Sequence, residues 1–115
     1  MFGMEIFVIH KQSDEHYYAA LRANNGRVIL KGKDCTNLTD CKYSIDSIRS
    51  NATDYSNFEL LTANDGKYYF RVKGSGGDEI ARSENFEDTS QRYEGIVLVR
   101  KTIPYALVDD LTFAV

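Results

Sequence analysis

Along the chain, the spacing of hydrophobic residues changes from about two to about 3.6 residues, and this change occurs twice. In the first half, alternating residues predict strands at 5–10, 17–22 and 28–31. The helical stripe that follows consists of Leu38, Cys41, Ile45 and Ile48. The first half is therefore predicted to be a β-β-β-α unit.

The second half repeats this pattern at an offset of 51 positions, because Tyr17-Tyr18 recurs as Tyr68-Tyr69 with no insertion between the copies. Other matched pairs are Phe7/Phe58, Asp14/Asp65, Leu21/Val72, Gly26/Gly77, Ile29/Ile80, Lys31/Arg82, Ile45/Ile96, Ile48/Val99 and Arg49/Arg100. Strands are predicted at 58–63, 68–73 and 79–82. The second helical stripe consists of Tyr93, Ile96, Val99 and Ile103.

Turn and capping residues recur at the same offset. Tight turns are predicted at 13–15 and 64–66, and again at 24–26 and 75–77. The cap positions are Asn37 with Asp40 in one copy and Asp88 with Gln91 in the other. Pro104 is predicted to end the second helix, because proline cannot continue it.

These patterns predict an α+β fold in which two tandem β-β-β-α repeats share one antiparallel sheet. Both helices are expected on one face of the sheet, with pseudo-twofold symmetry. Residues 1–115 form a single domain, with repeat one at about 4–52, repeat two at about 55–104 and a C-terminal tail at 105–115. Within the tail, Leu111-Thr112-Phe113 is a candidate short strand.

Composition agrees with an ordered domain, since 43% of the 115 residues are hydrophobic and 27% are charged. The net charge of −3 gives no overall attraction for nucleic acid or for an anionic membrane. No run approaches the roughly 18 apolar residues of a membrane span, and the N-terminus lacks the features of a signal peptide. With two cysteines outside any zinc or redox motif, a cytoplasmic location is expected.

The residue types that often carry chemistry have simpler interpretations here. His10 and His16 match Leu61 and Lys67 in the other copy, so they are interpreted as solvated strand residues. Cys35 and Cys41 are expected to be apolar contacts, and the glycines at 74–77 lie between strands and form a turn rather than a phosphate loop. The acidic runs at 84–88 and 109–110 are interpreted as solvated. No catalytic residue, metal site or cofactor is therefore predicted.

One surface has a functional interpretation, namely the sheet face opposite the helices. Alternation predicts that aromatic and cationic side chains gather there. The candidate binding residues are Tyr18, Arg22, Tyr69, Arg71 and Lys73. The alternative is that these long side chains only cover the sheet against water, as in many antiparallel sheets.

The second copy contains the motifs Phe58-Glu59, Gly66–Lys73, Gly77, Ile80–Glu84, Phe86 and Gly95-Ile96. The matching motifs of the first copy are Tyr17-Tyr18, Leu21, Ala23–Gly26, Val28–Leu30, Cys41, Ile45 and Ser47–Ala52. By these motifs the chain resembles the YegP-like family, also designated UPF0339 or domain of unknown function 1508. The first copy departs from the family at 32–35, where Ser-Glu and an aromatic residue are favoured, and at Ser44, where glycine is usual.

The resemblance implies one continuous sheet with helices on one side, built from tandem repeats or from paired single repeats. It carries no established activity and no catalytic residue. We therefore expect a non-enzymatic module that binds a protein or small-ligand partner through the open sheet face, as a pseudo-dimeric monomer for which further homodimerisation is possible. An enzyme of unknown reaction and a single-stranded nucleic-acid binder remain alternatives, with nucleic acid disfavoured by the acidic balance.

Overall fold

The computed structural model describes residues 5–23 and 25–110, and the strands and helices of that part follow the predicted order. The first half contains β1 (Ile6–Ser13), β2 (His16–Arg22), β3 (Val28–Cys35) and α1 (Leu38–Asn51). After the short 3₁₀ turn η1 (Tyr55–Asn57), the second half contains β4 (Phe58–Thr62), β5 (Tyr68–Lys73), β6 (Glu79–Ser83) and α2 (Thr89–Thr102). A last strand, β7, spans Leu107–Asp110.

The described strands form one sheet in the order β4-β5-β6-β3-β2-β1-β7. The two halves join in the middle, where β3 and β6 pair antiparallel. At one edge β7 pairs parallel to β1, so the sheet is mixed and the expectation of a fully antiparallel sheet is wrong there. The cause is the tail, which returns from α2 alongside β1 in the same direction. The candidate strand at 111–113 lies outside the described residues.

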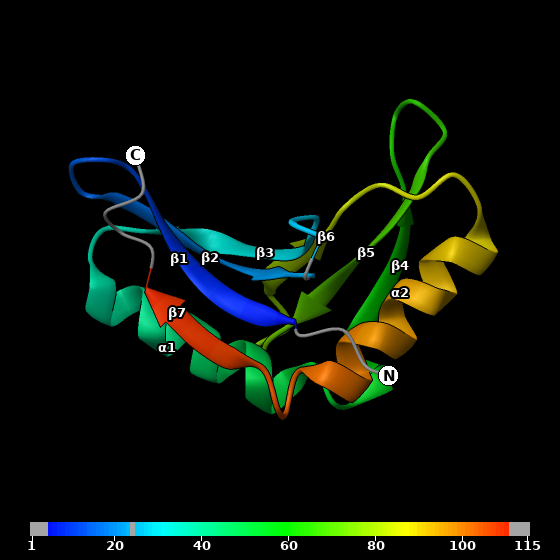
Figure 1. Cartoon of the computed structure of the whole chain (residues 1–115). Coiled ribbons are helices and arrows are strands. Elements are labelled where there is room, and N and C mark those ends of the chain that lie inside the picture. The colour runs from blue at the N-terminus through cyan, green and yellow to red at the C-terminus, as the bar shows by residue number, and fades with distance from the viewer. Residues whose placement is uncertain (1–4, 24, 111–115) are drawn as a thin grey trace.

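Both helices lie on the same side of the curved sheet, and the open face on the other side is concave (Figure 1). The core fills the layer between sheet and helices, with Phe7 and Phe70 completely buried. In α1, Cys41, Ile45 and Ile48 are buried as the stripe predicts. In α2, Ile96 and Val99 are buried, as is Ile103 directly after the helix, but Tyr93 is 60% exposed. The inclusion of Tyr93 in the stripe was therefore wrong.

Gly95 explains the orientation of α2. A Cβ at this position would lie 2.6 Å from Cζ of the buried Phe86. Because the absence of a side chain lets the helix approach this ring closely, the buried face of α2 includes Gly95. Arg92 turns toward the sheet instead of Tyr93, donating from Nη1 to the Leu61 carbonyl at 3.0 Å.

The helix caps form where they were predicted. Asn37 Oδ1 accepts a hydrogen bond from the Asp40 N–H at 2.9 Å, and Asp88 Oδ1 accepts one from the Gln91 N–H at 2.8 Å. Both bonds satisfy backbone donors that a helix N-terminus leaves free. The two helices therefore start at equivalent positions of their halves.

Each helix also carries an arginine near its end that contacts the segment after the other helix. Arg49 of α1 donates to the carbonyls of Ile103, at 2.7 Å, and of Ala106, and its guanidinium lies over the Phe7 ring. Arg100 of α2 donates to the carbonyl of Thr53 at 3.2 Å. The matched arginines thus link the two halves.

Candidate binding surface on the open sheet face

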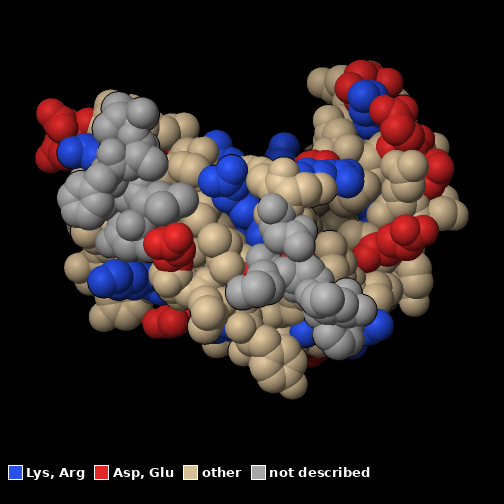
Figure 2. Space-filling view, in the orientation of Figure 1, with Lys and Arg blue, Asp and Glu red and all other residues tan. Residues whose placement is uncertain are grey.

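The strand registers bring three cationic side chains next to one another on the open face. Lys31 of β3 pairs with Arg82 of β6, which in turn pairs with Arg71 of β5. We call these three residues the cationic row. Because it occupies adjacent strands, which lie about 4.8 Å apart, the positive charges are concentrated at the middle of the sheet. Figure 2 shows Lys and Arg atoms along the hollow between the two raised ends of the molecule.

Two members of the cationic row lie against tyrosine rings. Lys31 Nζ lies 4.3 Å from the centre of the Tyr18 ring, and the Arg82 guanidinium lies 4.9 Å from the centre of the Tyr69 ring. Both are cation–π contacts, which hold a cation against the negative face of the ring. The two pairs are also equivalent, since each residue of one pair matches its counterpart 51 positions later.

The five candidate residues predicted from the sequence are all half-buried strand residues, but they do not form one cluster. Tyr18 on β2 and Tyr69 on β5 are separated by β3 and β6. Arg22 lies at the end of β2, where its Nε donates to the Gly26 carbonyl at 3.3 Å. Lys73 pairs with Glu79 across β5 and β6, and Arg71 alone belongs to the cationic row.

The sequence reasoning missed Lys31 and Arg82, which connect the two tyrosines. Both are exposed, and both were among the matched pairs of the repeat. The available signal was that a cation recurs in the third strand of each copy. That signal does not show which residues the two cations lie beside, because this depends on the pairing of β3 with β6.

Carboxylates form ion pairs with the two arginines of the cationic row. Arg71 forms ion pairs with Glu59 and with Glu79, the latter at 3.9 Å, and Arg82 pairs with Glu79 at 3.0 Å. Glu59 and Glu79 match Val8 and Val28 in the first copy, so the equivalent acids are missing there. Within the described part of the chain, no carboxylate lies within 4.0 Å of Lys31 Nζ.

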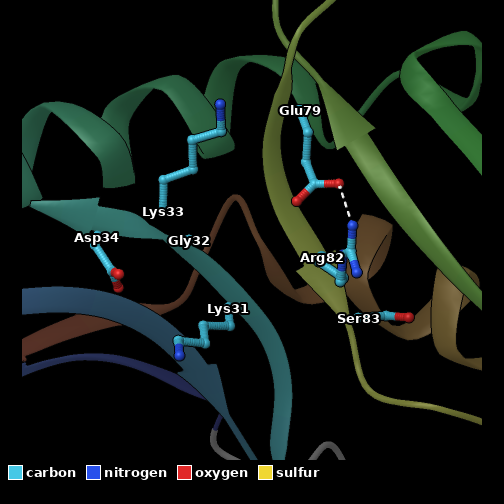
Figure 3. Close-up of a pocket in the computed structure, with 7 residues that line it drawn as sticks. All are labelled: Lys31, Gly32, Lys33, Asp34, Glu79, Arg82 and Ser83. Carbon is cyan, nitrogen blue, oxygen red and sulfur yellow. Dashed lines mark hydrogen bonds and ion pairs between the residues drawn. The ribbon is translucent and has the colours of Figure 1, made fainter.

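A hollow of about 360 Å³ lies where β3 and β6 diverge beyond their paired residues (Figure 3). Lys31 and Arg82 line it from the two strands, and Glu79 is hydrogen-bonded to Arg82 beside it. In Figure 3, Lys33 leaves β3 in the opposite direction from Lys31. The other lining residues are Gly32, Asp34 and Ser83.

His10 lies close to two of the positive charges on this face, those of Arg22 and Lys31. Its ring stacks on Tyr18 with the ring centres 4.9 Å apart. Burial lowers the pKa of His10, and the nearby charges of Arg22 and Lys31 lower it further. The interpretation of His10 as a solvated residue is thus too simple, since it is half-buried against an aromatic ring.

Most other chemically suggestive residues have structural roles. Cys35 and Cys41 are both buried in the core. The glycines at 74–77 form a turn in which the Gly77 N–H donates to the Gly74 carbonyl at 2.9 Å. In the acidic run, Glu84 pairs with Arg27 at 2.7 Å and Glu87 pairs with Lys67 at 3.0 Å.

In residues 5–23 and 25–110, no three potential metal ligands lie close enough together to hold an ion. None of the described helices is long and apolar enough to cross a membrane.

Comparison with known proteins identifies the family. The model of the domain of unknown function 1508 matches twice, at residues 12–59 and 63–110, so the two matches begin 51 positions apart. The chain belongs to this family. Two matches in one chain show that it is a two-repeat member, as the sequence predicts.

Proteins designated UPF0339 match almost the whole chain. One from Bordetella pertussis is 33% identical, covering 96% of this chain and 100% of the relative. Escherichia coli YegP is 32% identical, covering 92% and 96% respectively. These relatives and the family model are described without a function, so the family is one of unknown function.

Two solution NMR structures have the same fold. That of Escherichia coli YegP, described as a protein of unknown function, gives a TM-score of 0.86 at 30% identity and covers 97% of this chain and 96% of that chain. That of a UPF0339 protein from Shewanella oneidensis also gives 0.86, at 25% identity, and covers 96% and 93% respectively. This chain therefore shares its α+β fold with these two proteins.

Proposed function

We propose that the protein is a non-catalytic binding module that takes its partner on the open sheet face. The observation that carries this proposal is the repeated tyrosine–cation pair, Tyr18 with Lys31 and Tyr69 with Arg82. Each pair presents a positioned cation toward the concave side of the sheet.

We further propose that the two β-β-β-α units are related by a pseudo-twofold axis between Lys31 and Arg82. The register around this pair supports it, because Leu30 pairs with Ser83 and Gly32 pairs with Ala81. Replacing each residue by its match 51 positions away exchanges these two pairs. The axis would make the binding face one site shared by both halves.

A binding role is favoured over catalysis because the perturbed groups do not converge. Among the described residues, His10, Asp54, Lys67 and Arg82 have shifted pKa values. These lie in β1, in the link before η1, in the β4–β5 turn and in β6, whereas catalytic sites gather such groups in one cleft. We also infer a cytoplasmic location, which is supported by two cysteines that are buried in the core and match no zinc or redox motif.

The test is partner recovery from cell lysate with the full chain. Replacing Tyr18, Tyr69 and Arg71 by Thr keeps residues that favour strands but removes most of the face. We expect partners recovered by the wild type to be lost by this variant. The control variant, Tyr43→Ala/Tyr93→Ala/Lys101→Ala, changes exposed residues on the helices and should recover them unchanged.

Melting temperatures must show that both variants remain folded. Equal recovery by all three proteins would contradict binding through the open face. Turnover of a recovered small molecule by the wild type would contradict a non-catalytic role.

A further inference from the structure

We propose that the cationic row is a phosphate-binding site whose ligand is a phosphate group on a small molecule. The inference rests on the proposed function, because it names the ligand class of the same face. Lys31 and Arg82 are the main donors, and Arg71 flanks them.

The first argument is the pairing of like charges. Cations directly opposite each other on neighbouring strands destabilise a sheet, whereas opposite charges stabilise it. Elsewhere on this face the favourable arrangement occurs, since Glu59 pairs with Arg71 and Glu79 pairs with Lys73. The Lys31–Arg82–Arg71 succession breaks that rule at the middle of the sheet. Glu79 bridges Arg71 and Arg82, but no carboxylate of the described residues lies within 4.0 Å of Lys31 Nζ. The conflict therefore remains at the Lys31–Arg82 pair, and such local conflicts are expected at functional sites.

The second argument is donor capacity. Lys31 is exposed and no carboxylate is within 4.0 Å in the described residues, so its ammonium group can donate to a ligand. Arg82 Nη2 donates a hydrogen bond to Glu79 Oε1 at 3.0 Å. The Nε and Nη1 groups of Arg82 form no hydrogen bond with described residues, so both can donate to a ligand. The bond from Glu79 and the Tyr69 ring hold the guanidinium in place, which reduces the entropy lost on binding.

The third argument distinguishes a phosphate from a nucleobase. Tyr18 lies between His10 on β1 and Lys31 on β3, and it contacts both. Because these neighbours flank the ring, it is not free to stack on a base in the manner of single-strand binding proteins. A phosphate needs cationic donors instead, and its charge of about −1.5 to −2 suits several adjacent cations better than one carboxylate does. The hollow of about 360 Å³ is open to solvent and is lined by Lys31 and Arg82, so a phosphate group in it can reach both cations.

Calorimetric titration of the full chain with inorganic phosphate and with pyrophosphate, at matched ionic strength in chloride, tests the proposal. We expect saturable binding that Lys31→Gln/Arg82→Gln weakens about tenfold or more, because two charge-assisted hydrogen bonds are lost. The control Lys42→Gln/Lys101→Gln removes the same charge from exposed helix positions and should leave the affinity within about twofold. Lys31→Gln alone keeps the Arg82–Glu79 bond and should give part of the loss.

A second readout is the NMR titration of His10. A bound phosphate would offset the charges of Arg22 and Lys31, so the pKa of His10 should rise on binding in the wild type. The same rise should be absent in Lys31→Gln/Arg82→Gln.

Absence of saturable phosphate and pyrophosphate binding at millimolar concentrations would overturn the inference, as would an equal loss in the control variant. Binding of a hexaglutamate peptide without binding of either phosphate would assign the row to acidic peptides and overturn it as well. If the lysate partners still depend on the open face in any of these cases, the proposed function stands and only the phosphate assignment fails.

Discussion

Glu15 shows the repeat at the scale of a single residue, because it occupies a position where the second copy has glycine. Its φ is +62°, and the matched Gly66 has a φ of +87°. A left-handed conformation costs a residue with a Cβ roughly 1–2 kcal/mol, whereas glycine adopts it freely. The first β-hairpin therefore contains a strained residue that the second avoids.

We predict that Glu15→Gly raises the free energy of unfolding by about 0.5–1 kcal/mol, after the extra entropy of glycine in the unfolded chain is subtracted. Urea denaturation measures the change as a higher midpoint. The reverse substitution, Gly66→Glu, should lower it. A lower midpoint for Glu15→Gly would contradict the assignment of strain to this residue.

His10 predicts a pH dependence of stability. Its folded-state pKa lies below the ordinary 6.5, so between those two values the unfolded chain binds more protons than the folded chain. The free energy of unfolding should therefore fall as the pH drops through this window and level off below the folded-state pKa. His10→Gln should reduce this slope in denaturation curves recorded from pH 7 downward.

NMR titration of His10 provides the direct measurement. Arg22→Gln should raise the pKa of His10 only partly, because burial is the largest cause of the shift. A His10 that titrates at or above 6.5 in the wild type would show that the prediction is wrong.

Predictions for single residues were confirmed where the backbone at that position requires one kind of residue. The caps at Asn37 and Asp88 follow from backbone donors that need an oxygen, and the turn glycines follow from positive φ. The prediction that Tyr93 belongs to the buried stripe is wrong, because helical periodicity fixes the spacing of a stripe but not which of two adjacent stripes is buried. Contact between Gly95 and Phe86 decides that, and it joins residues on different elements.

At the scale of elements, the packing of α2 on the sheet depends on Gly95. Gly95→Ala would normally favour a helix by about 1 kcal/mol, but its Cβ would lie 2.6 Å from Cζ of Phe86. Overpacking of this kind costs typically about 1–3 kcal/mol, so we predict that the helix-propensity gain is at least cancelled and that the net loss reaches up to about 2 kcal/mol.

Chemical denaturation of single and double variants checks this prediction. Phe86→Leu makes space, so Gly95→Ala should cost less in that background than in the wild type. Equal costs in the two backgrounds would show that Phe86 does not limit the approach of α2. Glu94→Ala, at an exposed position of the same helix, controls for helix propensity.

The repeat predicted the three-stranded meander of each half, but it did not predict that β7 forms an edge of the sheet beside β1. Strands β1 and β4 occupy the same position in their copies, and each pairs with the strand that follows it. After α2, the chain instead crosses to the far edge of the sheet and pairs with β1 as β7. Leu107 and Val108 are 68% and 46% exposed, so this strand lacks the hydrophobic alternation that would have revealed it.

The sequence was enough to predict which face of the sheet carries the candidate site, but not which of its residues lie side by side. Alternation of Tyr18 with Ala19, and of Tyr69 with Phe70, is enough to separate the open face from the core. Which cations lie side by side depends on the β3–β6 register, which joins residues 51 positions apart and is set by tertiary pairing. The cationic row therefore required the structure.

At the scale of the whole molecule, the two halves are held together by more than the central strand pair. Arg49 is half-buried and supplies hydrogen bonds to two carbonyls after α2, in addition to its contact with Phe7. Its match, Arg100, is exposed and donates to the Thr53 carbonyl. The equivalent residues should therefore contribute unequally to stability.

We predict that Arg49→Ala lowers the free energy of unfolding by about 2–3 kcal/mol, because it leaves polar groups without partners in a buried layer. Arg100→Ala should cost less than about 1 kcal/mol, since water replaces its exposed contact. Urea denaturation measures both, and hydrogen exchange of β7 should accelerate in Arg49→Ala before that of β5, because Arg49 anchors the segment that leads into β7. Equal losses for the two variants would mean that the halves are joined symmetrically, and that the return of the tail to β1 contributes nothing beyond the repeat.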